Sequence, residues 1–252
     1  MSITLSLENK IDWQIGECPY GNLHKESTRA WLIALWEIVL ASDDIETPDD
    51  IEILGINPTF KLVYKDRPSI KAILTMSLVW QYLCLLHEAL LPVCTPLFCV
   101  RSSESDRASY WCFVSWVEGS CDRVNSLNAN HIKSIPTNVW YSLGSLLACI
   151  HSIPTNNDLY YLTSIDIGWW NYVIDEQKNV WLIDPKKFQS DEFPERWIYF
   201  NIFFHKHITF EQKQAFIEGY ASVELKERSQ TGMEMLLAAK QFSDMLYEKL
   251  AN

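Results

Sequence analysis

The spacing of apolar residues changes partway along the chain, and this change narrows the choice of folds more than any other feature. Between Ile51 and Trp116 most apolar residues fall in short segments divided by polar or proline-containing turns, which is typical of strands. Beyond Gly119 most of them recur at helical spacing. The pattern predicts an α+β fold with two lobes, a small antiparallel sheet followed by a larger, mainly helical part.

The first part is expected to form about five strands and one helix between the third and the fourth. The predicted strands are Ile51–Asn57, Thr59–Tyr64, Ser69–Leu74, Pro96–Arg101 and Tyr110–Trp116. Met76–Leu91 has the helical period and ends before Pro92. An earlier helical segment, Glu26–Ser42, predicts an extension at the N-terminal side. We therefore expect an N-terminal lobe over residues 1–118 and a helical C-terminal lobe over residues 119–252.

Charge and cysteine usage exclude several classes of partner. The net charge is −11 in 252 residues, so nucleic acids and anionic membranes, which reward clustered lysine and arginine, are not expected to bind. A neutral or cationic substrate is easier to accommodate. The seven cysteines are scattered in mostly apolar segments of the sequence. This pattern predicts buried thiols in a cytoplasmic protein. No apolar run is long enough to span a bilayer.

Three polar side chains with the chemistry of phosphoryl transfer follow one another in the second part. Asp166 and Asn171 lie on a predicted loop, a hairpin follows, and Asp184 comes directly after an apolar strand. Transfer from a nucleotide needs a carboxylate that orients the attacking hydroxyl and oxygen ligands that hold Mg²⁺ on the phosphates. Taken alone, the same residues also suit simple turns, since Asp and Asn favour turns and Asp184 precedes Pro185.

The order and spacing of these residues resemble the aminoglycoside phosphotransferase and choline kinase family, whose members have a protein-kinase-like fold. The family's His-x-Asp-x-x-x-x-Asn loop is matched by Ser164-Ile165-Asp166 and Asn171, and its Ile-Asp metal segment by Ile183-Asp184. The helix before the loop is matched by Leu143–Pro154, and the hinge strand that meets the adenine by Phe113–Gly119. No single motif is specific, and the match covers roughly Pro92–Lys187.

The resemblance implies ATP and Mg²⁺ as cofactors, a small-molecule hydroxyl as acceptor, and a role for each matching residue. Asp166 corresponds to the catalytic base, and Asn171 and Asp184 to the ligands of Mg²⁺. His151 corresponds to a buried hydrogen-bonding residue. The residues that correspond to nucleotide contacts are Lys71 for the phosphates, with Lys65 as the runner-up, Val117 for the adenine and Gly55 for the phosphate-covering turn.

Several departures from the family pattern leave a second interpretation open. Ser164 stands where the family has His, and the segment Ile53–Phe60 holds a single glycine. The first half of the predicted helix Met76–Leu91 has no glutamate to pair with Lys71, since Gln81 is its polar residue. The alternative is a catalytically inactive pseudokinase that binds or regulates a partner, which could then be a protein.

Two further clusters have an ordinary and a functional interpretation. The acidic residues Asp191, Glu192 and Glu195 suit either a surface that attracts a cationic acceptor or a simple solvated face. The pair His205 and His207 could suggest a metal site, but alternate residues share a face poorly, and a solvated or capping role is favoured.

Overall fold

The computed structural model divides into two compact units. One consists of Met1–Leu85 with Cys94–Trp116, and the other of Leu86–Val93 with Val117–Asn252. The structure describes residues 48–54, 59–102, 109–119, 129–155, 160–164, 171–184, 188–203, 205, 207–223, 234, 236–238, 240 and 241. The predicted helix Glu26–Ser42 and Gly55 lie outside these residues.

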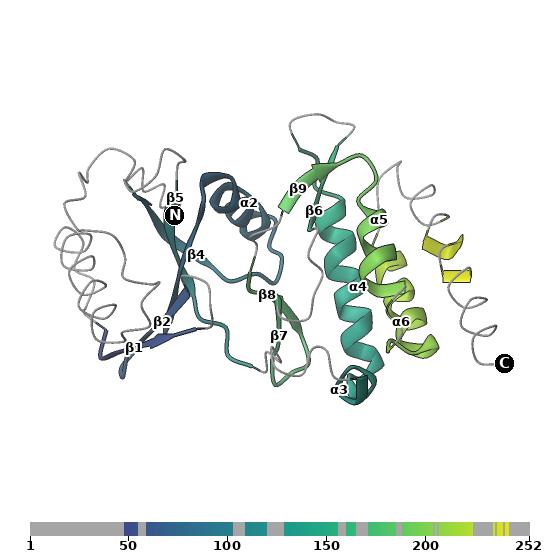
Figure 1. The fold of residues 1–252 in the computed structure, drawn as a ribbon, viewed down its shortest axis with the longest axis horizontal. Helices are drawn as coiled ribbons and strands as arrows, with labels where there is room; N and C mark the ends of the chain where they lie inside the picture. Colours follow the sequence, from purple (N-terminus) through teal and green to yellow (C-terminus); the bar gives the residue numbers. More distant parts are fainter. Residues whose placement is uncertain are drawn as a thin grey trace. The chain divides into compact units, whose positions relative to one another are not determined.

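The first unit is built on a five-stranded antiparallel sheet (Figure 1). Its strands are β1 (Asp50–Ile53), β2 (Thr59–Val63), β3 (Ile70–Met76), β4 (Pro96–Ser102) and β5 (Ser109–Ser115), in the order β1-β2-β3-β5-β4. The helix α2 (Ser77–Glu88) follows β3 directly. The predicted run of strands, with one helix between the third and the fourth, is therefore confirmed.

Both faces of this sheet are buried near its centre. Phe60, Ala72 and Phe113 stand opposite one another on β2, β3 and β5, and each has 0% of its surface exposed. Lys61, Lys71 and Val114 form the next row in register, on the opposite face because successive side chains alternate. The candidate lysine is thus set in the middle of a central strand, where it is 8% exposed.

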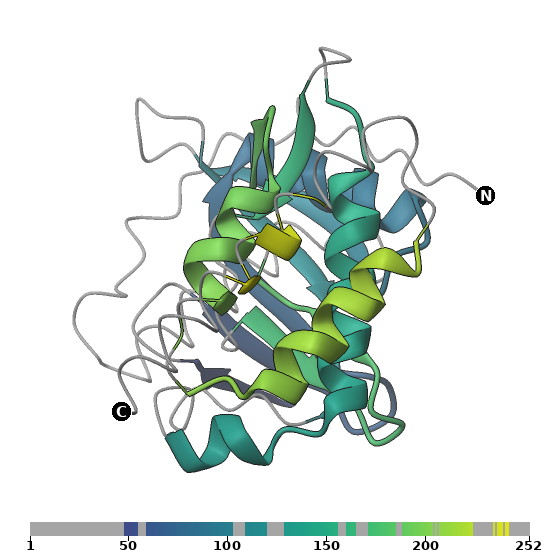
Figure 2. The same ribbon diagram turned by 90° about the vertical axis from the view of Figure 1, so that its right-hand side faces the viewer.

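The second unit is organised around a long helix, α4 (Thr137–His151), which packs against α6 (Phe210–Ala221) (Figure 2). The contact is close because a glycine of each helix meets the other helix's backbone. A Cβ on Gly144 would lie 2.1 Å from the carbonyl oxygen of Phe216, and one on Gly219 would lie 2.0 Å from that of Tyr141. Only glycine allows the two backbones to approach this far.

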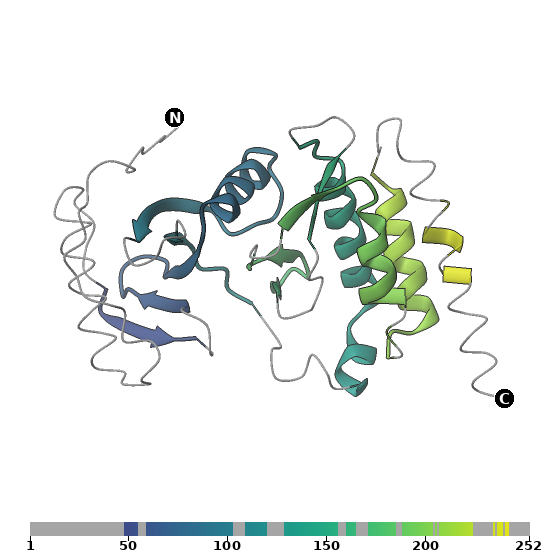
Figure 3. The same ribbon diagram turned by 45° about the horizontal axis from the view of Figure 1, so that its top comes forward.

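Short elements surround this helix pair. They are α3 (Ala129–Ser134), α5 (Glu195–Ile198) and a π-helical turn (Tyr199–Phe203), which continues α5 (Figure 3). Gln212 of α6 joins α3 to the helix pair, since its amide donates to the carbonyl oxygens of Ile132 at 2.9 Å and of Ile135, just after α3, at 2.8 Å. Its oxygen accepts from the backbone N–H of Thr209, the N-cap of α6, in a capping box.

Two small antiparallel ribbons complete the second unit. β7 (Tyr172–Ile174) pairs with β8 (Val180–Leu182) as the predicted hairpin. β6 (Tyr161–Ser164) pairs instead with β9 (Phe188–Asp191), a long-range pairing that local periodicity did not indicate. The predicted hairpin is therefore nested within a second ribbon.

Candidate functional site

The β7–β8 hairpin is closed by the side chain of Asp175. Its carboxylate accepts hydrogen bonds from the backbone N–H of Asn179 at 2.8 Å, the side-chain amide of Asn179 at 2.9 Å and the indole of Trp181 at 2.9 Å. Burial acts to raise the pKa of Asp175, but these hydrogen bonds outweigh it and hold the pKa below the ordinary value. Lys178 completes the turn with φ of 69°. The turn thus fixes the register of the two strands.

The open end of this hairpin brings Asn171 and the Ile183–Asp184 segment together. Asn171 immediately precedes β7 and is 5% exposed, while Asp184 comes just after β8 and is half-buried. The backbone N–H of Ile183 donates to the carbonyl oxygen of Asn171 at 2.9 Å. Two of the three residues predicted for phosphoryl transfer therefore lie at the same end of the hairpin. Asp166, the third, lies outside the described residues.

The donor set at this end of the hairpin fits Mg²⁺. Carboxylate and amide oxygens are ligands that this ion accepts, and Mg²⁺ commonly takes only one or two protein carboxylates together with phosphate oxygens and water. Asp184 supplies the carboxylate and Asn171 the amide. Among the residues that the structure describes, no group of three or more His, Cys, Asp or Glu side chains is placed to hold a metal ion.

Val117 is the first residue of the second unit's main stretch and is held near β7 by Gly119. Gly119 has φ of +150°, and a Cβ there would lie 2.5 Å from both the carbonyl oxygen of Ile174 and a methyl carbon of Val173. This conformation and this space both require glycine. On the other side of the hairpin, the N–H of Leu182 donates to the carbonyl oxygen of Pro92 at 3.0 Å. The predicted hinge residue Val117 and the β7–β8 hairpin thus belong to the same packed region.

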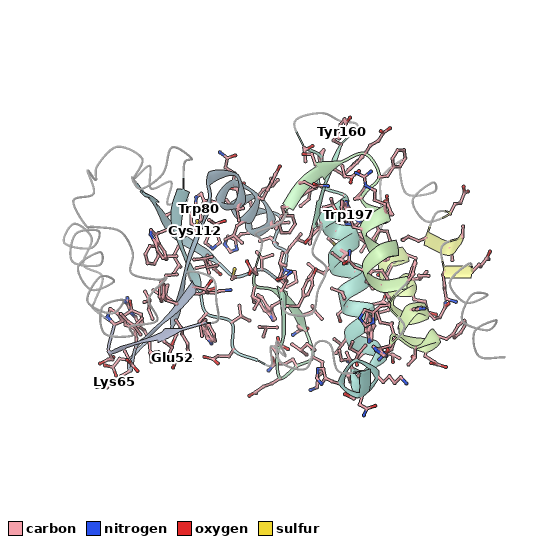
Figure 4. All side chains as sticks on the ribbon, viewed as in Figure 1. Glu52, Lys65, Trp80, Cys112, Tyr160 and Trp197 are labelled. Atoms are coloured by element: carbon pink, nitrogen blue, oxygen red, sulfur yellow. The ribbon has the colours of Figure 1, made fainter. Side chains whose placement is uncertain are left out.

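Lys71 and its runner-up Lys65 occupy different environments in the first unit. Lys71 is the buried lysine of β3, with Lys61 opposite it on β2. Lys65 lies just beyond the end of β2 (Figure 4), and its ammonium group is 3.3 Å from a carboxylate oxygen of Asp49. That side chain is 79% exposed, so Lys65 is a surface residue.

The acidic cluster after the hairpin is not a surface facing a substrate, and neither of its two interpretations was right for Asp191 and Glu195. Asp191 is 3% and Glu195 4% exposed, whereas Glu192 is exposed. Asp191 accepts from the backbone N–H of Phe193 at 2.9 Å and from the indole of Trp197 at 2.9 Å, and it pairs with Arg196 at 2.6 Å. Figure 4 shows Trp197 on α5. The carboxylate therefore anchors the start of α5 to β9.

His151 is a buried hydrogen-bonding residue, as the family resemblance implied. It is 2% exposed, its Nδ1 lies 2.9 Å from the hydroxyl of Tyr220, and its Nε2 lies 3.1 Å from the hydroxyl of Thr163. The Tyr220 hydroxyl also donates to Glu195 at 3.2 Å. Sequence reasoning missed the other three members, because they come from elements that are far apart in the chain.

The remaining candidates add no site. His205 and His207 stack edge to face with ring centroids 5.6 Å apart, and the N–H of His207 donates to the ring of His205 at 3.4 Å. Among the described cysteines, Cys84, Cys94, Cys99, Cys112 and Cys149 are all without a disulfide. No helix in the described part of the chain is both long and apolar enough to cross a bilayer.

Solved structures share this architecture at low sequence identity. A spectinomycin phosphotransferase in complex with ADP and spectinomycin aligns with a TM-score of 0.54 and 12% identity, over 85% of this chain and 86% of that one. A macrolide 2′-phosphotransferase from Brachybacterium faecium aligns with a TM-score of 0.52 and 12% identity, over 82% of this chain and 87% of that one. WaaP in complex with acyl carrier protein aligns with a TM-score of 0.51 and 16% identity, over 82% of this chain and 91% of that one.

Comparison of the sequence itself gives no further relative. No protein-family model matches the chain. A search of curated proteins likewise found no match. The resemblance deduced from spaced residues is therefore supported through the fold, with its five-stranded antiparallel sheet and its helical second unit. The chain has the two-lobed protein-kinase-like fold, in the divergent form that is similar to aminoglycoside and macrolide phosphotransferases.

Proposed function

We propose that the protein is an ATP- and Mg²⁺-dependent phosphotransferase that moves the γ-phosphoryl group to a hydroxyl of a small molecule. The observation that carries this proposal is the open end of the β7–β8 hairpin, where the backbone N–H of Ile183, the residue before Asp184, donates to the carbonyl oxygen of Asn171. The fold adds support, since two similar structures are phosphotransferases of spectinomycin and of macrolides.

Each predicted residue has a defined task in this reaction. Asp184 and Asn171 would hold Mg²⁺, which would neutralise charge on the phosphates when it is bound. Asp166 would orient the acceptor hydroxyl and take its proton. Lys71 would contact the phosphates, Val117 would offer backbone groups to the adenine, and Gly55 would allow a turn over the phosphates. Positioning and charge neutralisation then supply most of the rate.

The acceptor is a small hydroxyl compound, and a cationic one suits the net charge of −11. The buried carboxylates Asp191 and Glu195 would not contact it, because their partners are within the protein. Attraction would come from the overall charge rather than from this cluster. We place the enzyme in the cytoplasm, in keeping with its thiols.

A pseudokinase is the second candidate, and a feature of α2 favours it. The first turn of α2 has no acidic residue, and Gln81 is exposed. Glu88, the glutamate of this helix, is its last residue and is also exposed. The first half of the helix therefore offers Lys71 no carboxylate. A protein partner would be expected in that case.

Thermal unfolding with ATP and Mg²⁺ distinguishes the two candidates. A ligand present at 100 times its Kd stabilises the folded state by about 2.7 kcal/mol, so an enzyme should show a clear rise in Tm. Asp184→Ala should lose the Mg²⁺-dependent part of that rise. Asp166→Ala should keep the rise and lose turnover of a hydroxyl acceptor, and turnover that survived would refute the assignment of the base.

Two lysines offer a matched pair for the nucleotide site. Lys71→Met keeps most of the side-chain volume but removes the charge, and it should weaken ATP binding. Lys65→Met makes the same change at an exposed residue and should leave binding as it was. Equal effects of the two variants would contradict the role of Lys71. A wild-type protein that shows no shift with ATP would favour the pseudokinase.

A further inference from the structure

Four thiols that are scattered along the sequence come together in the first unit. They belong to Cys84 of α2, to Cys94 just before β4, to Cys99 of β4 and to Cys112 of β5. Figure 4 labels Cys112 on the sheet. Burial, and after it the electrostatic influence of Cys99, Cys84 and Cys94, raises the pKa of Cys112 well above the ordinary value of 9.0. Such an influence falls off with distance, so the four residues form a thiol cluster.

Cys99 and Cys112 are the two members of this thiol cluster that face each other directly. They are partners in the antiparallel pairing of β4 with β5, and the register is regular on both sides of them, from Phe98 to Ser102. Directly opposite Cα atoms in such a pair lie about 4.5 to 5.5 Å apart, with both side chains on the same face of the sheet. A disulfide needs a Cα separation of about 4.4 to 6.8 Å. The backbone therefore already has the separation that a bond between the two sulfurs requires.

The two thiols differ in their access to solvent. Cys99 is half-buried on β4, the last strand in the order β1-β2-β3-β5-β4. Cys112 lies on the neighbouring inner strand β5 and is 3% exposed. A dissolved oxidant therefore reaches Cys99 first, and Cys112 is placed to react with the product that forms there.

A metal site is the other chemistry that a thiol cluster suggests. In the described part of the chain, however, no group of three or more His, Cys, Asp or Glu side chains is placed to hold a metal ion. All members of the cluster are also without a disulfide. The cluster is thus in its reduced form, and its geometry favours the joining of one opposed pair of thiols over the binding of an ion.

We propose that Cys99 and Cys112 form a modification site, at which a peroxide produces a reversible disulfide between β4 and β5. The Cys99 sulfur first attacks one oxygen of hydrogen peroxide, which gives a sulfenic acid and one molecule of water. The Cys112 sulfur then attacks the Cys99 sulfur, the S–S bond forms, and the hydroxyl leaves as a second molecule of water. The two sulfurs are oxidised, the peroxide is reduced, and the protons of both thiols end in the water. A dithiol reductant reverses the change.

The raised pKa of Cys112 determines the rate of the second step. The thiolate is the nucleophile in this chemistry, and Cys112 supplies little of it at neutral pH. The titratable groups that act on Cys112 are the thiols of Cys99, Cys84 and Cys94. Disulfide formation should therefore be at least about ten-fold faster at pH 9 than at pH 7, as the thiolate fraction rises. Equal rates at the two pH values would contradict the part assigned to Cys112.

Mass spectrometry of the full chain tests the proposal. The reduced protein is treated with hydrogen peroxide, unfolded and then alkylated with N-ethylmaleimide. We expect the wild type to lose two hydrogens and to take up two N-ethylmaleimide groups fewer than the untreated protein, and dithiothreitol should restore both. Cys99→Ser and Cys112→Ala should each abolish this loss of a thiol pair. Gain of oxygen without loss of a thiol pair, or a disulfide between two chains, would overturn the proposal.

The other two members of the thiol cluster provide matched controls. Cys84 is half-buried, as Cys99 is, and Cys94 is 1% exposed and so is buried like Cys112. Cys84→Ser and Cys94→Ala should therefore retain the disulfide. Its loss in either control variant, or its persistence in Cys99→Ser, would rule out the pairing of Cys99 with Cys112.

Thermal unfolding tests whether the bond forms in the folded arrangement of the sheet. A disulfide that fits the native register constrains the unfolded chain, so oxidation should raise the Tm of the wild type by about 5 °C and leave that of Cys99→Ser as it was. An unchanged or lower Tm of the oxidised wild type would mean that the bond does not fit the register, against the proposal. None of these measurements needs ATP or turnover, so their outcome is independent of the proposed function.

Discussion

Asp191 keeps its charge in a buried position. Burial acts to raise its pKa, but hydrogen bonds from Phe193, Trp197 and Arg196, together with the charge of Arg196, outweigh it and hold the pKa below the ordinary value of 3.8. Its side chain is 2% exposed and that of Arg196 is 52% exposed. A group whose pKa is lower in the folded state stabilises the protein above its unfolded pKa and loses this contribution as the pH falls.

Replacing Asp191 tests this contribution. Asp191→Asn should lower the free energy of unfolding at pH 7 by about 1 to 3 kcal/mol, because several charge-assisted hydrogen bonds are lost. It should also reduce the fall in stability below about pH 4, since the group that takes up a proton on unfolding is gone. Urea unfolding at pH 7 and at pH 3.5 measures both effects.

Glu192 is the natural control because it is the next residue and is exposed. Glu192→Gln makes the same change in charge and should alter the free energy of unfolding by no more than about 0.5 kcal/mol. If Glu192→Gln and Asp191→Asn had equal effects, net charge rather than the buried contacts would be responsible.

At the scale of elements, the crossing of α4 and α6 depends on two glycines. Gly144 and Gly219 each place their Cα against the backbone of the other helix, where no side chain could shift to make room. Gly144→Ala should destabilise the protein by about 1 to 3 kcal/mol through overpacking, although alanine is the better helix former. Thermal or urea unfolding measures the loss.

The control for this prediction lies in the first turn of the same helix. Asn138 is exposed, so Asn138→Ala introduces the same residue where there is space. Its effect on the free energy of unfolding should be within about 0.5 kcal/mol. A Gly144→Ala protein that was as stable as the wild type would show that the helices can move apart without cost.

At the scale of the whole molecule, the net charge is −11 and the sequence pI is about 5.0. A protein with this balance has little to gain from releasing the counterions of a nucleic acid. We predict no complex with a short DNA duplex at 50 mM salt and protein concentrations near 10 µM, a concentration at which non-specific DNA binders with Kd of about 1 to 100 µM begin to bind. A gel shift would check this, and a retarded band would contradict it.

Much of the fold could be predicted because its signals are local. The alternation in Thr59–Val63 is a property of a few consecutive residues, and this strand was found within one residue of its expected bounds, Thr59–Tyr64. The β7–β8 hairpin also encloses a short turn. Asn171 and Asp184 flank that hairpin, so their proximity follows from its register.

What the amino-acid sequence determined by itself was therefore the type and order of the elements of the sheet and of the β7–β8 hairpin, while the role of Asn171 and Asp184 as metal ligands stays a prediction. Only the tertiary structure decided that β6 pairs with β9, that Asp191 and Glu195 are buried, and that His151 joins Tyr220 and Thr163. The physical reason is the distance along the chain over which each kind of interaction acts. Periodicity and turn chemistry act between near neighbours, whereas burial and hydrogen bonding between distant elements depend on how the whole unit packs.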